Sequence, residues 1–198
     1  GLLFPLAAGV YDLAIGQTVG LSAILSAYLV THGLDTGSAL GLILVLGLAI
    51  GLLNALLVVV IGINSFIATL GVSSVLLAMI GATSNRQQII GLPEGMVELG
   101  TGELFGIPLP VIYLVVFAAV AWYVLEHSPY GRYLYAIGGG PEAARLAGVP
   151  TKALVAGALV ISSVVAAFAG YIVTAKLGAG SPDVGSGYLL PAYAAAFL

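Results

Sequence analysis

The sequence is poor in charged residues and contains no cysteine. Of its 198 residues only 7% are Asp, Glu, Lys or Arg, whereas a soluble domain carries about 25%. A chain with so few charges cannot cover a globular surface with groups that water solvates, which excludes an ordinary soluble protein. The absence of cysteine excludes disulfides and thiolate metal sites.

Motifs for nucleotide binding and catalysis are also missing. No Gly-x-x-x-x-Gly-Lys-Ser/Thr phosphate loop is present, so this chain does not itself hydrolyse ATP. It has no His-Glu-x-x-His zinc motif, and its two histidines, His32 and His127, lie far apart near expected helix ends, where a structural or interfacial role is favoured. The net charge is −3, and the sequence has no acidic or basic block. Both observations argue against nucleic acid as a partner. We therefore expect no catalytic residue, no metal and no cofactor.

Long apolar runs dominate what is present. The chain is 61% hydrophobic, with a mean hydropathy of +1.17, so its solvent is a lipid bilayer. A helix that crosses a membrane needs about 20 mostly apolar residues. This length predicts an all-α polytopic transmembrane helix bundle, a single domain over 1–198, with crossings at 13–30, 39–61, 65–84, 107–126 and 153–175 and parts of two more at 1–10 and 189–198. Because the chain starts and stops inside apolar runs, we expect it to be a fragment of a longer protein, truncated at both ends.

The first apolar stretch, 2–30, predicts an interrupted helix. A straight helix of this length would measure about 43 Å, which exceeds the hydrocarbon core of a bilayer. We expect a break between Gly9 and Gly16, where Asp12 lies among apolar residues. An acid inside a membrane should face protein, water or free backbone N–H groups, so Asp12 and Gly16 are candidates for a helix break or gating element. The alternative is that Asp12 only caps a helix that starts at Leu13.

Small and polar residues are scattered through the spans. Three glycine pairs have the GxxxG spacing that allows close helix packing: Gly16/Gly20, Gly37/Gly41 and Gly47/Gly51. Hydroxyl and amide side chains suit either a path for a neutral solute or hydrogen bonds between helices. These residues are Ser22, Ser26, Asn54, Thr69, Ser73, Ser74, Ser162 and Ser163, of which Asn54, Thr69 and Ser73 are our candidates for a translocation path.

Residues 138–150 predict a short helix with an unpartnered apolar face. Pro141 suits the first helical position, Glu142 lies in the first turn, and Gly148 with Pro150 ends the helix. A two-turn helix is unstable alone but can seat as a knob in a groove of another protein. The alternative is a surface loop helix with no partner. The residues that we assign to this docking element are Glu142, Ala143, Ala144, Arg145, Leu146, Ala147 and Gly148.

Four segments resemble one family of transporters. Residues 131–149 look like the cytoplasmic coupling segment of ribose/galactose-type ABC importer permeases, although these usually have Asn where this chain has Gly140. Residues 11–17 resemble the Asp-Leu-Ser-Val-Gly-Ser signature of that family, with Ala14 and Gln17 in place of two serines. Residues 62–71 are similar to Ile-Asn-Pro-Phe-Ile-x-Thr-Leu-Gly, with Ser65 in place of proline, and 178–188 look like the Gly-rich loop before a late helix.

The resemblance implies the permease subunit of a binding-protein-dependent importer in the bacterial inner membrane. Such a subunit moves a sugar or similar small polar solute and is not an enzyme, because the ATPase activity resides in separate subunits. The implied partners are ABC ATPase subunits on the cytoplasmic side, a second permease copy that completes a dimer, and an extracytoplasmic solute-binding protein. The alternative is a secondary transporter driven by ions, for which Asp12 is the one candidate carboxylate.

The distribution of Lys and Arg predicts the orientation. Arg132, Arg145 and Lys152 lie in the 127–152 segment, and short loops rich in such residues stay in the cytoplasm, which places 85–106 outside. Single cysteines introduced at Ser128 and Thr101 should therefore differ in their reaction with an impermeant maleimide applied to intact cells. Only the cysteine at Thr101 should react. Labelling at Ser128 alone would show that the orientation is the opposite of the predicted one.

Overall fold

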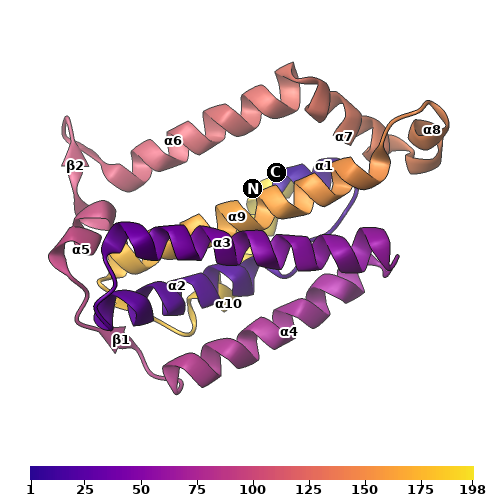
Figure 1. Ribbon diagram of the computed structural model, residues 1–198. Helices are drawn as coiled ribbons and strands as arrows, with labels where there is room; N and C mark the ends of the chain where they lie inside the picture. Colours follow the sequence, from indigo (N-terminus) through magenta and orange to yellow (C-terminus); the bar gives the residue numbers. More distant parts are fainter.

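The computed structural model describes residues 1–198 as a bundle of helices (Figure 1). In chain order the helices are α1 (Leu3–Ala7), α2 (Ile15–Thr31), α3 (Thr36–Ala55), α4 (Ser65–Ser84), α5 (Glu94–Thr101), α6 (Leu109–Trp122), α7 (Pro129–Gly139), α8 (Pro141–Leu146), α9 (Thr151–Leu177) and α10 (Val184–Phe197). One π-helical turn extends α3 (η1, Leu56–Val60) and another extends α6 (η2, Tyr123–His127). The strands β1 (Ile89–Ile90), β2 (Glu103–Leu104), β3 (Ile107–Pro108) and β4 (Ala179–Gly180) are two residues each. The predicted all-α class is confirmed.

Four helices are long and apolar enough to cross a membrane. They are Thr36–Val60, Ser65–Ser84, Leu109–His127 and Thr151–Leu177, while Ile15–Thr31 is an apolar helix of intermediate length. Their ends follow local sequence chemistry. The Asp35 carboxylate caps α3 by accepting hydrogen bonds from the backbone N–H groups of Gly37 (2.9 Å) and Ser38 (3.3 Å), and Asn64 caps α4 in the same way.

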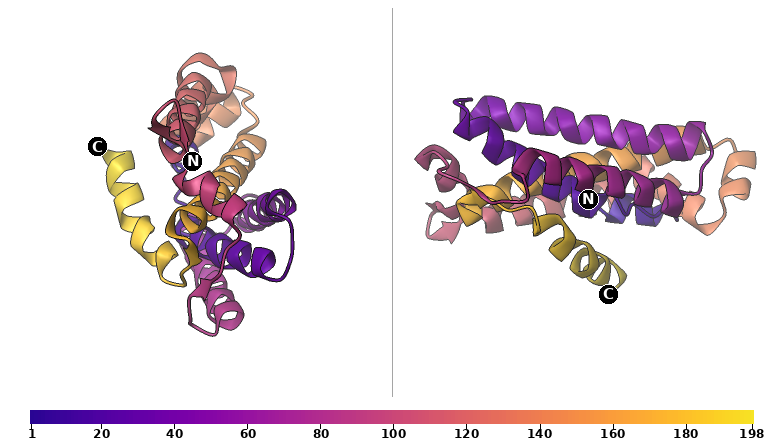
Figure 2. Two further views of the ribbon diagram at one scale, coloured as in Figure 1. Left: turned by 90° about the vertical axis from the view of Figure 1, so that its left-hand side faces the viewer. Right: turned by 90° about the horizontal axis from the view of Figure 1, so that it is seen from below.

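The helix α9 is the centre of the bundle, with α2 and α3 packed along it (Figures 1 and 2). Two of the three GxxxG pairs lie at helix contacts. A Cβ added at Gly51 would lie 2.6 Å from Val160 Cα, and one added at Gly20 would lie 3.2 Å from Gly185 Cα of α10. By contrast, an added Cβ at Gly41 would meet nothing within 4 Å. Glycine therefore brings α3 against α9 and α2 against α10, as small residues do in membrane bundles.

The two ends of the bundle carry different secondary structure. At one end, α5 packs against the last turns of α9, and β1 pairs antiparallel with β4 (Figure 1). At the other end lie the turn between α3 and α4 and the helices α7 and α8. The three cations Arg132, Arg145 and Lys152 belong to this second end. The glutamates at 94, 98 and 103 belong to the first end, so the structure separates these acids from the three cations on which the orientation was predicted.

Three sequence expectations need correction in detail. The segment 85–106, which separates two of the predicted crossings, contains α5, whose buried residues are only Met96 and Gly100. The segment 127–152 contains α7 as well as the expected short helix, so the first two glycines of 138–140 are helical. The last helix begins at Val184, inside the expected Gly-rich loop 178–188. Helices this short are marginal by themselves, so they depend on tertiary contacts that the sequence pattern does not show.

The close approach of α3 to α9 gives a test. We expect Gly51→Ala to lower the free energy of unfolding by about 1–3 kcal/mol, because the new methyl group overlaps the backbone at Val160. Gly41→Ala adds the same methyl group where nothing is in contact, and it should be neutral or stabilising because alanine is the better helix former. Unfolding in detergent, followed by the fluorescence of Trp122, measures both variants. Equal stability of the two would contradict the packing.

Candidate functional site

The chain reverses direction at residues 8–14, which we call the corner. Gly1 lies against Val165 of α9, whereas α1 ends at Ala7 beside Gly138 of α7. Within the corner the chain returns to α9, where Asp12 bonds to Ser162, and it then enters α2 at Ile15. Gly9 has φ +71°, a left-handed conformation that glycine adopts without steric cost. The chain therefore runs towards the end of the bundle that carries α7 and α8 and turns back sharply there.

Side chains of α4 satisfy the backbone of the corner. The N–H of Tyr11 donates to Ser65 Oγ (3.2 Å), and the N–H of Leu13 donates to Thr69 Oγ1 (3.0 Å). The Thr69 hydroxyl in turn lies 3.3 Å from the Tyr11 carbonyl and 2.7 Å from the Ser65 carbonyl, the two acceptors within its reach. A backbone N–H left unpaired in an apolar medium costs several kcal/mol, so these hydroxyls stabilise the non-helical segment.

Asp12 connects the corner to α9. Its side chain is fully buried, with Oδ1 accepting from the N–H of Ala14 (3.1 Å) and Oδ2 accepting from Ser162 Oγ (2.9 Å). It is the only charged residue that is buried, and the one salt bridge of the chain lies elsewhere. Asp12 lies two residues before Ala14, the N-cap position of α2, so it closes a local turn with Ala14 and also binds another helix. Asp12 therefore does more than cap a helix that starts at Leu13, which was the alternative prediction.

Gly16 has a packing role in the structure. An added Cβ would lie 3.0 Å from both the Gly185 carbonyl oxygen and Leu189 Cβ, so Gly16 admits α10 against α2. One position further on, Gln17 donates from Nε2 to Ser186 Oγ of α10 (3.2 Å). The start of α2 is thus fixed on two sides, by α9 through Asp12 and by α10 through Gly16 and Gln17.

The helix α8 has an exposed apolar side chain on one side and is packed into the core on the other. Leu146 is 81% exposed, and Ala143 and Ala147 are exposed beside it. On the opposite side, Ala144 is buried among residues of α1, α7 and α9. The Arg145 guanidinium bonds to the Glu142 carboxylate (2.9 Å) on the helix surface, and Gly148 turns the chain with φ +83°. The geometry is that of a rigidly mounted knob.

A shared core joins α7 and α8 to the rest of the bundle. Phe4 and Ala8 from the N-terminal segment pack in one buried cluster with Leu134 and Ile137 of α7, and Ala158 of α9 completes it. Tyr130 adds a polar contact, since its hydroxyl donates to the Leu154 carbonyl of α9 (3.1 Å). Burial raises the pKa of Tyr130 to about 12, so the phenol keeps its proton and remains a donor.

The three candidate path residues lie in different surroundings. Asn54 is completely buried, and neither its side-chain oxygen nor its nitrogen has a hydrogen-bond partner. Thr69 bonds to the corner, and Ser73 is partly buried one turn further along α4. None of the three lines the cavity of about 730 Å³ or the cavity of about 640 Å³. Within this single chain they do not form one solute site.

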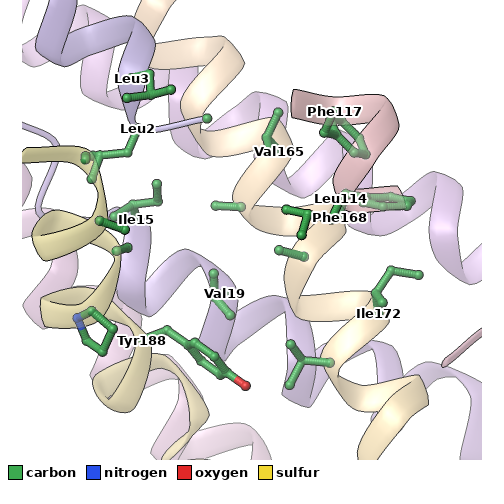
Figure 3. A pocket seen from close by; sticks show the side chains of 18 of the residues that line it. Leu2, Leu3, Ile15, Val19, Leu114, Phe117, Val165, Phe168, Ile172 and Tyr188 are labelled. Atoms are coloured by element: carbon green, nitrogen blue, oxygen red, sulfur yellow. The ribbon is translucent and has the colours of Figure 1, made fainter. Parts of the chain in front are cut away.

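The apolar cleft beside α9 does not suit a sugar. It is a cleft of about 730 Å³ between α2, α6, α9 and α10, and 20 of its 24 lining residues are hydrophobic (Figure 3). Leu114, Phe168 and Ile172 are among the apolar side chains that point into it. A sugar needs several hydrogen-bond partners, whereas acyl chains of lipid need none. The cleft is therefore a hydrophobic surface of the bundle.

Two residues that complete the corner were not singled out from the sequence. Ser65 appeared only as a replacement for proline, and Ser162 only as one of many polar residues in the spans. A sequence signal does exist for α4, because Ser65 and Thr69 are four residues apart and so share one helix face. No such signal exists for Ser162, which is 150 positions from Asp12.

Sequence comparisons identify relatives over the full chain. The profile of a family described as branched-chain amino acid transport system, permease component, matches residues 1–198. Ribose import permease protein RbsC of Haemophilus influenzae is 31% identical over 98% of this chain and 62% of its own length. D-allose transport system permease protein AlsC of Escherichia coli is 33% identical over 100% of this chain and 61% of its own. Autoinducer 2 import system permease protein LsrD of Photorhabdus luminescens is 27% identical over 100% and 61%.

The chain thus spans less than two thirds of the length of these relatives. No solved structure matches it.

The bond between Asp12 and Ser162 gives a prediction with an adjacent control. Ser162→Ala leaves a buried carboxylate oxygen without its donor, and we expect the free energy of unfolding to fall by about 1–3 kcal/mol. Ser163→Ala removes a buried hydroxyl that has no partner, so stability should stay the same or rise. Thermal unfolding of both variants in detergent measures the difference. A loss at Ser163 as large as that at Ser162 would contradict the role given to Asp12.

Proposed function

The chain belongs to the family of permease components of branched-chain amino acid-type transport systems, and we propose that it is the transmembrane permease subunit of an ABC importer for a sugar or similar small polar solute. It is a multi-pass protein of the bacterial plasma membrane, with four helices able to cross it. The relatives named for ribose, allose and autoinducer 2 support an importer, and they agree in carrying small polar solutes. ATP hydrolysis in separate subunits drives the transport.

The observation that carries this proposal is the exposed face of α8. An apolar side chain as exposed as Leu146, on a two-turn helix whose opposite side is fixed in the core, is typical of a docking element. Because Arg132, Arg145 and Lys152 lie around it, the positive-inside rule puts α8 in the cytoplasm, where ABC ATPase subunits act. The alanines beside Leu146 allow a partner to approach closely.

The remaining partners complete the transporter. A second permease copy forms a dimer across which the solute passes. Asn54, Thr69 and Ser73 contribute to this path from the membrane helices, and because Asn54 and Thr69 are buried within the single chain, they reach the solute only when the helices move. An extracytoplasmic solute-binding protein delivers the solute at the end that carries α5 and β1. Asp12 and Gly16 then act in gating, since they fix the start of α2 between α9 and α10.

A secondary transporter is the less favoured class. Coupling to protons or sodium inside a membrane uses chains of buried carboxylates or histidines. Here Asp12 is the only charged residue that is buried, and both of its oxygens accept hydrogen bonds from fixed groups of the protein. The arrangement is that of a carboxylate that positions helices, not of one that binds an ion.

The docking of α8 is tested by three substitutions in the complete permease. Leu146→Asp should weaken the complex with the ATPase tenfold or more, because burying a leucine is worth about 1.5–3 kcal/mol and about 1.4 kcal/mol is a factor of ten. Ala143→Trp should do the same by steric exclusion. Glu142→Gln should act mildly, since a charge at an exposed helix start contributes about 0.3–1 kcal/mol.

The assay is co-purification of the ATPase together with solute-stimulated hydrolysis in reconstituted vesicles. Leu146→Met, which keeps volume and apolarity, is the matched control and should assemble normally. Normal assembly and stimulation in both severe variants would show that α8 is only a surface helix. Failure of any ATPase to co-purify with the unaltered permease would favour the secondary transporter.

A further inference from the structure

The C-terminal part of α7 makes a backbone-to-backbone contact that the proposed function leaves unused. Gly138 faces the end of α1, and a Cβ added there would overlap the carbonyl oxygen of Ala7. A Cβ added at Gly9, inside the corner, would in turn lie 3.6 Å from Gly138 Cα. The neighbouring Gly139 also belongs to α7, yet a Cβ there would meet nothing within 4 Å. Of the two consecutive glycines Gly138 and Gly139, only Gly138 occupies a position where a side chain would not fit.

This contact joins the docking helix to the corner by a short path. α8 follows α7 after the single residue Gly140, so a partner that pulls on Leu146 acts on the end of α7. Gly138 bears on Ala7, the residue before the corner, and Asp12 lies within the corner. On its other side, α8 leads into α9 through Val149 and Pro150, and α9 carries Ser162. The two partners of the hydrogen bond between Asp12 and Ser162 are thus each connected to α8.

We propose that Gly138 is a positioning residue that passes movements of the α7–α8 segment to the 8–14 corner, and so to the start of α2. The inference rests on the proposed function, because it needs an ATPase that moves α8. Close-packed backbone transmits displacement, since no flexible side chain lies between the two elements to absorb it. The corner can respond at Tyr11 and Leu13, because the N–H groups of these two residues are held by the hydroxyls of Ser65 and Thr69, which can exchange partners.

The test compares Gly138→Ala with Gly139→Ala in the complete transporter, reconstituted with its ATPase and binding protein. Both variants should co-purify with the ATPase as the unaltered permease does, because α8 is unchanged. In Gly138→Ala the number of solute molecules imported per ATP hydrolysed should fall by about tenfold, as overpacking displaces the corner from α7. Gly139→Ala should keep the original ratio. A role in stability alone would lower the amount of assembled transporter without changing this ratio.

A second measurement needs no variant and decides the matter if Gly138→Ala does not assemble. Hydrogen exchange in the unaltered complex, with and without ATP trapped by vanadate, should change for the amides of Tyr11 and Leu13. The amides of the α2–α3 turn at the opposite end serve as the internal reference. Unchanged exchange throughout 8–14, or equal import per ATP in the two alanine variants, would overturn the role of Gly138. Loss of ATPase binding by the unaltered permease would instead refute the proposed function.

Discussion

The need to satisfy backbone hydrogen bonds away from water governs this structure. Helices meet it by themselves, but the corner at residues 8–14 cannot. Two hydroxyls of α4, from Ser65 and Thr69, accept from its N–H groups, and the Asp12 carboxylate accepts from Ala14 and from Ser162. Because these partners belong to α4 and α9, the corner forms only when both helices are in place. The irregular segment therefore ties together elements that are far apart in the chain.

Glycine supplies the second constraint, close approach of helices. Gly51 brings α3 against α9, and Gly16 admits α10 against α2. Without a difference in apolarity between lipid and protein, such contacts depend on packing and interhelical hydrogen bonds. The bundle is accordingly dense around α9, whereas α6 buries no residue and contacts α9 through aromatic pairs such as Tyr113 with Phe168.

These two constraints meet at the end of the bundle that carries α8. Leu146 is exposed there because Ala144 is buried on the other side of the same helix, and α7 beneath it touches the corner through Gly138. A knob that is rigidly attached to a non-helical corner is well suited to transmit a partner's movement into a membrane bundle. This arrangement links the family resemblance of residues 131–149 to a physical route through the protein.

The sequence by itself determined the bilayer as solvent, the all-α class and the start of the short helix at Pro141, because hydropathy and capping chemistry are local properties. It also indicated an interruption near Asp12, since the apolar run is too long for one crossing. Only the tertiary structure decided which hydroxyls complete the corner and which glycines are contacts. Ser162 and Ser163 are adjacent and chemically identical, yet one binds Asp12 and the other binds nothing. Likewise Gly138 and Gly139 differ only in the direction that each faces, which depends on how α7 docks on α1 and not on local sequence.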